Sequence, residues 1–270
     1  MYVWEQEVST AMRIVPKKKL QVEGLRVEIY PDRCQMGAAA ALQVAAQMKR
    51  LLANKAQLSM VFAAAPSQNE FLSILSSLDG LAWDRVIAFH MDEYVGMTPE
   101  APQSFRRYLK EHLLDKVRPG TIHLIRGETA DLLAECQRYA ELLKMYPIDI
   151  VCAGIGENGH LAFNDPYVAD FADRATIKVV ELDEQCRAQQ VHDGCFTHID
   201  LVPRQAITLT LPALMAAQAI FCMVPGPRKA EAVKATITGP IETSCPATIL
   251  RQHNQAILFL DCDSARLINA

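Results

Sequence analysis

The sequence has no apolar run near the roughly 18 residues that a membrane-spanning helix needs, and none near its beginning resembles a secretion signal. Glycine is scarce, at 12 of 270 residues, and this excludes collagen-like and low-complexity proteins. Hydrophobic residues make up 50% of the chain, which is enough for a large buried core. We therefore expect a globular, cytoplasmic protein that does not bind membranes.

The eight cysteines also lack the arrangement of a structural metal site. None forms a C-x-x-C pair, and no close group of cysteines and histidines has the spacing of zinc ligands. Several cysteines lie in apolar runs, where a free thiol behaves as a small hydrophobic group. We expect reduced thiols and no bound metal.

An excess of positive charge is absent too. There are 27 lysines and arginines against 31 acidic residues, a net charge of −4. Such a chain has no overall field that attracts nucleic acid, so nucleic acid is not an expected partner. Any anionic ligand must be held by a local group of donors.

Apolar strands alternate with amphipathic helices along most of the chain. This rhythm predicts an α/β fold with a doubly wound, mostly parallel sheet in a single domain. Residues 1–24 are expected to form an N-terminal extension and residues 25–270 the domain. No regular element is predicted in the charged segment before residue 198. The predicted strands cover residues 58–65, 85–91, 122–124, 148–154, 206–210, 219–224 and 256–261, and the helices 34–53, 69–78, 104–117, 130–145, 211–217 and 228–236.

Two acidic residues end one predicted strand, in the segment FHMDEYVG at residues 89–96. Ligands of parallel sheets bind where the strands end, so a carboxylate at this place is a candidate for acid-base chemistry. Side chains of neighbouring residues in a strand point to opposite sides. One of Asp92 and Glu93 can therefore enter a cleft while the other caps a helix or faces solvent.

A glycine-rich loop follows the strand at 148–154 and reads GIGENGHLAFNDP over residues 154–166. Its glycines permit a tight backbone path beside a ligand. His160 stands five residues before Asp165, and a carboxylate hydrogen-bonded to an imidazole fixes its tautomer for proton transfer. The glycine spacing does not favour a nicotinamide cofactor, because no acidic ribose ligand follows. A structural histidine stays the alternative.

A third loop, VPGPRKA at residues 224–230, joins a strand to a helix and carries two cations. Unpaired N–H groups and the helix dipole favour an anion at such a junction. A solvated basic first turn is the alternative. All three loops are expected at one edge of the sheet.

Together, these segments resemble the glucosamine-6-phosphate isomerase/deaminase family. The resemblance rests on FHMDEYVG followed by PQSF at residues 102–105, on the glycine-rich loop, and on CPATIL at residues 245–250 with His253. It spans about residue 25 to the C-terminus. It implies a modified Rossmann-like fold and a reaction without a cofactor, in which an amino-sugar 6-phosphate becomes a ketose 6-phosphate and ammonia. Members are often homo-oligomers, so self-association is expected.

The resemblance also assigns roles to individual residues. Asp92 matches the general base that moves a proton between C2 and C1 of the open-chain sugar. His160 matches the ring-opening histidine, and Asp165 stands where the family usually has a glutamate that orients it. Asn158 lies where members have Asp or Asn. Lys229 matches the lysine that binds phosphate.

This chain departs from the family pattern at the phosphate end. The family's glycine-rich phosphate loop is replaced by AAAPSQNE at residues 63–70, where Ser67, Gln68 and Asn69 are the possible donors. His192 stands where the family has an arginine, so the site lacks a permanently charged bidentate donor at this position. Backbone N–H groups of the loop containing Gly156 and Gly159 are expected to contact the substrate.

Two other readings of the family likeness remain. A lactonase resembling 6-phosphogluconolactonase has the same fold and a similar Gly-His loop. A sugar-phosphate sensor resembling the effector domain of some repressors is the other, although the first 24 residues are too short for a helix-turn-helix. Turnover of amino-sugar phosphates separates the enzyme from the sensor.

Overall fold

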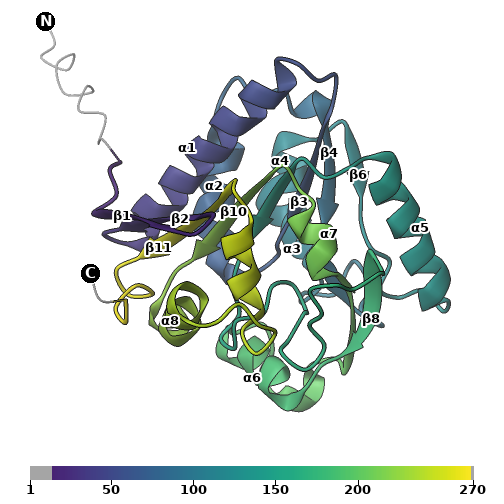
Figure 1. The fold of residues 1–270 in the computed structure, drawn as a ribbon. Helices are drawn as coiled ribbons and strands as arrows, with labels where there is room; N and C mark the ends of the chain where they lie inside the picture. The colour runs from purple at the N-terminus through teal and green to yellow at the C-terminus, as the bar shows by residue number, and fades with distance from the viewer. Residues whose placement is uncertain (1–13, 269–270) are drawn as a thin grey trace, which may run out of the picture.

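The computed structural model describes residues 14–268 and is built around one large twisted sheet (Figure 1). Its strand order is β1-β2-β11-β10-β7-β3-β4-β6, and all neighbours are parallel except β1 and β2. The α/β, mostly parallel fold predicted from the sequence is confirmed. The strands are β1 (Lys18–Val22), β2 (Leu25–Tyr30), β3 (Leu58–Phe62), β4 (Val86–His90), β6 (Thr121–His123), β7 (Ile150–Ala153), β10 (Ala219–Val224) and β11 (Ala256–Asp261).

The central strands carry apolar side chains on both faces because helices cover both sides of the sheet. Every residue of β3, β4, β7, β10 and β11 is buried. One hydrophobic cluster joins the sheet to α1 and α2, and a second joins its other face to α5, α7 and α8. The helices are α1 (Arg33–Leu52), α2 (Asn69–Ser77), α3 (Phe105–Leu109), a π-helical turn (Lys110–Leu114), α4 (Asp115–Val117), α5 (Leu132–Met145), α6 (Glu184–His192), α7 (Leu211–Met215) and α8 (Ala230–Thr238).

Hydrogen bonding of the sheet begins before residue 25. The strand β1 lies in the segment expected to be an N-terminal extension, yet it pairs with β2 residue for residue. In Figure 1 these two strands lie beside β11, which comes from the other end of the chain. The placement of residues 1–13, also part of that extension, lies outside the described residues.

A second, smaller sheet was not predicted from the sequence. It has three antiparallel strands in the order β5-β9-β8: β5 (Asp92–Tyr94), β9 (Gln205–Leu209) and β8 (Ile177–Glu181). The expected strand at 206–210 exists but belongs to this sheet. The charged segment before residue 198, to which the sequence assigned no regular element, contains both β8 and α6. The buried residues Gln189 and Gln190 of α6 are polar, so no apolar periodicity marks this helix.

Short turns of the 3-10 type link helices and strands within residues 14–268. Two of them, Pro66–Gln68 and Pro227–Lys229, come after β3 and β10 and begin with proline, whose fixed φ suits a helix start. The others are Trp83–Arg85, Ile199–Leu201 and Pro246–Gln252. No helix between residues 14 and 268 combines the length and the apolar character needed to cross a membrane.

Candidate active site

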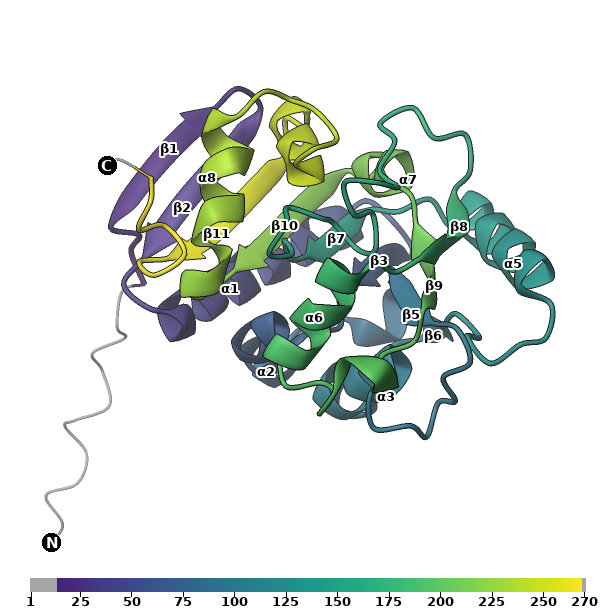
Figure 2. The ribbon, with the colours of Figure 1, turned by 90° about the horizontal axis from the view of Figure 1, so that it is seen from below.

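A pocket lies where β3, β4, β7 and β10 end, at the edge predicted from the sequence. Loops from all four strands contribute to its wall, and α6 lies in front of these strand ends in Figure 2. The predicted site residues that line it are Ser67, Gln68, Asp92, Gly156, His160 and Lys229.

The two adjacent acids face different surroundings. Asp92 lines the pocket, whereas Glu93 is fully buried beneath it. Glu93 accepts hydrogen bonds from the hydroxyl of Ser104 (2.9 Å) and from the backbone N–H of Arg106 (3.0 Å), and forms an ion pair with the Arg106 guanidinium (3.2 Å). Glu93 therefore holds the start of α3, which leaves Asp92 as the carboxylate available for chemistry.

Replacing Glu93 with glutamine is expected to lower the free energy of unfolding by about 2 kcal/mol, because the buried Arg106 guanidinium loses one of its two counter-charges and keeps only the partly exposed Glu128. Urea unfolding followed by circular dichroism measures the change. Glu111→Gln is the matched control, since its ion pair with Arg107 lies on the surface and should contribute little. Equal small losses in both variants would contradict a structural role for Glu93.

Asp92 is shielded from water and only 8% exposed. Burial raises the pKa of its carboxyl group well above the ordinary value, and the nearby negative charge of Glu93 adds to the rise. A carboxylate with a raised pKa is a stronger base, as removal of a carbon-bound proton requires.

We expect the Asp92 carboxyl group to titrate well above 3.8, its ordinary pKa. Since the protonated acid cannot accept a proton, the base form should be lost as the pH falls through the raised pKa. A carbonyl carbon NMR titration of protein with labelled aspartate measures this, and the Asp92 signal is the one missing in Asp92→Asn. Titration near 3.8 would show that this carboxylate is solvated.

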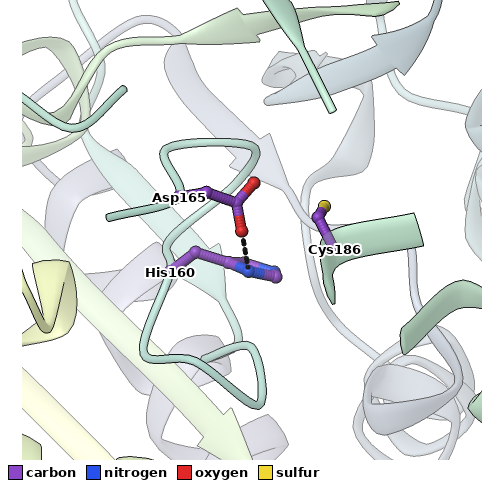
Figure 3. Close-up of side chains that lie close together, drawn as sticks. All are labelled: His160, Asp165 and Cys186. Carbon is purple, nitrogen blue, oxygen red and sulfur yellow. Dashed lines mark hydrogen bonds and ion pairs between the residues drawn. The ribbon is translucent and has the colours of Figure 1, made fainter. Parts of the chain in front are cut away.

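His160 is oriented by two oxygen atoms behind it. Its Nδ1 lies 2.8 Å from Asn158 Oδ1 and 2.9 Å from Asp165 Oδ1, and Asn158 Nδ2 donates to the same Asp165 oxygen at 2.7 Å. Figure 3 shows the Asp165 contact. Because both neighbours accept, we assign the proton to Nδ1, which leaves Nε2 as the acceptor in the neutral imidazole. Asp165 thus reaches the imidazole despite its short side chain.

Hydrogen bonding also stabilises the charge of Asp165. Burial alone would raise the pKa of this carboxyl group, but the hydrogen bond and the charge of His160, together with the Asn158 amide, bring it below the ordinary value. Asn158 and Asp165 do not line the pocket. They are positioning residues, and His160 is the group of this trio that faces the pocket.

Two glycines of the loop make room for neighbouring side chains, and their N–H groups are used within the loop itself. A Cβ on Gly156 would lie 2.2 Å from the His160 ring, and Gly159 has φ +85° and faces Cys245. The N–H of Gly156 already donates to His160 O, and that of Gly159 to Gly156 O. The expectation that these two N–H groups contact substrate is therefore not supported.

Lys229 is the cation of the pocket. It is the last residue of the turn before α8. Gly226, with φ +94°, directly precedes that turn. The ammonium is nearly buried and lines the pocket, and it forms no ion pair within residues 14–268. Burial lowers the pKa of Lys229, while the charges of Asp193 and Glu157 oppose that fall. A buried, unpaired cation in a pocket wall is suited to an anionic ligand.

Two predicted binding residues lie outside the pocket. The Asn69 side chain accepts from the hydroxyl of Tyr108 at 2.7 Å and lines a separate surface pocket. His192 is half-exposed, and its Nδ1 lies 3.5 Å from Glu157. Both residues lie at helix termini next to pocket residues, but their side chains turn away from it.

The helix α6 contributes pocket residues that sequence reasoning missed. Gln189 and Gln190 line the wall, as do Asp193 and Cys195 just beyond the helix. Gln189 accepts from the N–H of Glu157 (2.7 Å), and Gln190 accepts from the hydroxyl of Tyr94 (2.8 Å). The adjacent pair of glutamines was the available signal, because it gives a polar helix face with capacity for hydrogen bonds.

One cluster has the residue types of a metal site. The ligand atoms of His160, Asp165 and Cys186 lie within 4.8 Å of one another (Figure 3). Burial, and next the charge of Asp165, raise the pKa of the Cys186 thiol, so it keeps its proton. The imidazole of His160 and the carboxylate of Asp165 are already hydrogen-bonded to each other. These groups fit a hydrogen-bonded cluster better than a metal centre.

Comparison with known proteins identifies the family. Residues 31–259 match the family described as glucosamine-6-phosphate isomerases/6-phosphogluconolactonase. A glucosamine-6-phosphate deaminase of Halothermothrix orenii is 33% identical over 248 residues, covering 90% of this chain and all of that protein. A glucosamine-6-phosphate deaminase of Exiguobacterium sibiricum is 36% identical over 184 residues, which cover 68% of this chain and 71% of that protein.

Solved structures agree with this result. A monomeric glucosamine-6-phosphate deaminase superposes with a TM-score of 0.81 at 27% identity, covering 89% of this chain and 99% of that one. A 6-phosphogluconolactonase of Thermotoga maritima, at 18% identity and a TM-score of 0.71, shares the fold. The chain belongs to the glucosamine-6-phosphate isomerase/6-phosphogluconolactonase family, and the resemblance seen in the motifs is confirmed.

Proposed function

We propose that the protein is an enzyme of amino-sugar metabolism that converts an amino-sugar 6-phosphate, such as glucosamine 6-phosphate, into a ketose 6-phosphate and ammonia. The observation that carries this proposal is one pocket lined by a desolvated carboxylate, an oriented imidazole and a buried cation: Asp92, His160 and Lys229. The deaminase names of relatives that cover most of the chain support it.

Ring opening is the first task, and we assign it to His160. With the proton held on Nδ1, Nε2 can take the proton of the anomeric hydroxyl and return a proton to the ring oxygen. Asp165 stabilises the imidazolium formed in between. Both partners are buried, so the imidazole keeps one orientation through the step.

Proton transfer between carbon atoms is the second task, and we assign it to Asp92. The carboxylate removes the proton from C2 of the open-chain sugar and delivers it to C1, and a proton lost by the C2 ammonium group ends on O1, so that C1 becomes a CH2OH group and C2 carries an iminium. Water adds to C2, ammonia leaves, and the C2 carbonyl of the ketose forms. C1 is reduced and C2 is oxidised within the same molecule, so the step requires no external redox cofactor.

Binding of the phosphate is assigned to Lys229, with Ser67 and Gln68 beside it in the wall.

Homo-oligomer formation and a cytoplasmic location stay predictions, and the solved monomeric relative shows that the fold does not require self-association.

The test is incubation of the protein with glucosamine 6-phosphate and galactosamine 6-phosphate, with ammonia and ketose phosphate both measured. We expect equal amounts of the two products from at least one substrate. Tight binding without turnover would favour a sensor, and hydrolysis of 6-phosphogluconolactone alone would favour the lactonase.

A further inference from the structure

The wall around Lys229 contains a carboxylate as well as the cation. Asp193 follows α6 directly and lines the same pocket. Its Oδ2 accepts a long hydrogen bond from Gln189 Nε2, at 3.4 Å. Asp193 and Lys229 line one pocket, and the negative charge of Asp193, like that of Glu157, opposes the lowering of the Lys229 pKa by burial.

Gln68 adds a second acceptor to this wall. Its Nε2 donates to Ser67 Oγ (3.1 Å) and to the carbonyl of Met223 (3.3 Å). A carbonyl only accepts, so this contact fixes which end of the amide carries nitrogen. The Gln68 Oε1 atom is buried and has no partner among the described residues. Its capacity to accept a hydrogen bond is therefore unused among these residues.

The other nearby cation is engaged elsewhere. Arg228 is largely exposed, lies 3.7 Å from a carboxylate oxygen of Glu157, and donates to the carbonyl of His192 at 2.8 Å. It does not line the pocket. The positive charge of Lys229 is therefore offset by the negative charge of Asp193, and the pocket wall around Lys229 has no net positive charge.

A phosphate dianion offers acceptors only, so it matches Lys229 and the Ser67 hydroxyl but is repelled by Asp193 and by an unpaired carbonyl oxygen. A hydroxymethyl group has one donor and two acceptor positions, so it can accept hydrogen bonds from Lys229 and Ser67 and donate one to Asp193. We propose that Asp193 is a specificity-determining residue that weakens binding of a dianionic substituent at C6 and so narrows the preference for phosphorylated over unphosphorylated amino sugars. The effect on turnover rests on the function proposed above, whereas the effect on anion binding does not.

The experiment compares Asp193→Asn with the wild type. We expect the KM for glucosamine 6-phosphate to fall about fivefold, as for removal of one like charge from a partly solvated site, with a much smaller change for glucosamine. The dissociation constant of inorganic phosphate, measured by calorimetry, should fall by a similar factor. Asp193→Glu keeps the charge and should remain near wild type, and Asp200→Asn is an exposed control outside the pocket.

Unchanged or weaker phosphate binding in Asp193→Asn, or the same gain in Asp200→Asn, would overturn the proposal. Loss of the gain when Lys229→Met is added would place the bound phosphate in this pocket, whereas an undiminished gain would place it elsewhere and also overturn the proposal. Absence of turnover in the wild type, with tighter phosphate binding in Asp193→Asn, would refute the enzyme function but not the role of Asp193.

Discussion

Asp92→Asn is expected to lower kcat for ketose phosphate formation by about a thousandfold, because an amide cannot accept the proton from C2. The substitution keeps the shape of the side chain, so KM should change little. Stability should be maintained or rise, since a buried carboxylate is replaced by a neutral group. Initial rates of ammonia release and a thermal unfolding curve measure both effects.

Full activity in Asp92→Asn would show that another group moves the proton. The complementary comparison is Glu93→Gln, in which the catalytic carboxylate is retained and the support of α3 is weakened. We expect the two variants to separate: one loses turnover and keeps stability, and the other loses stability first. A parallel loss of both properties in both variants would contradict the division of roles between the adjacent acids.

Lys229→Met is expected to raise the KM for glucosamine 6-phosphate about a hundredfold. Among the described residues, Lys229 is the only lysine or arginine in the pocket wall, and a charge-assisted hydrogen bond in a shielded site contributes about 2–3 kcal/mol. The fold should not be weakened, because a buried ammonium without a partner disfavours folding. Steady-state kinetics and thermal unfolding measure the two effects.

Lys234→Met is the matched control, because Lys234 is exposed on α8, the helix that directly follows Lys229. It makes the same chemical change outside the pocket, so KM should stay at the wild-type value. A similar rise in KM in both variants would mean that the overall charge of the protein, and not the pocket, attracts the substrate.

The parallel sheet was predictable because its strands are buried on both faces and therefore appear as continuous apolar runs. The helix α6 was not, since two of its three buried residues are glutamines, whose hydrogen bonds help to hold it in place. The strand β5 was missed for a similar reason. Its first two residues are Asp92 and Glu93, and a buried acid in a strand is recognisable only once its partners are known.

The site was predictable where a local pattern fixes geometry. The spacing of His160 and Asp165 within one tight loop brings the side chains together, as the structure shows. The prediction was less successful for residues at helix termini, where the helix sets the direction in which each side chain points. Asn69 and His192 sit beside pocket residues in the sequence but turn outward, and Asp193, one residue later, faces inward. Successive side chains of a helix point about 100° apart, so one residue can face the pocket while its neighbour faces solvent. Which residue faces the pocket is unknown until the helix is placed.

The most direct test of the central claim is the fate of the C2 proton. Glucosamine 6-phosphate is incubated with the wild-type protein and with Asp92→Asn in D2O, and the ketose phosphate formed is examined by NMR. We predict ammonia in an amount equal to the ketose phosphate, deuterium or transferred C2 hydrogen only at C1, and product formation by Asp92→Asn at about a thousandth of the wild-type rate. Release of ammonia without hydrogen delivery to C1, or equal product from both proteins, would contradict the account.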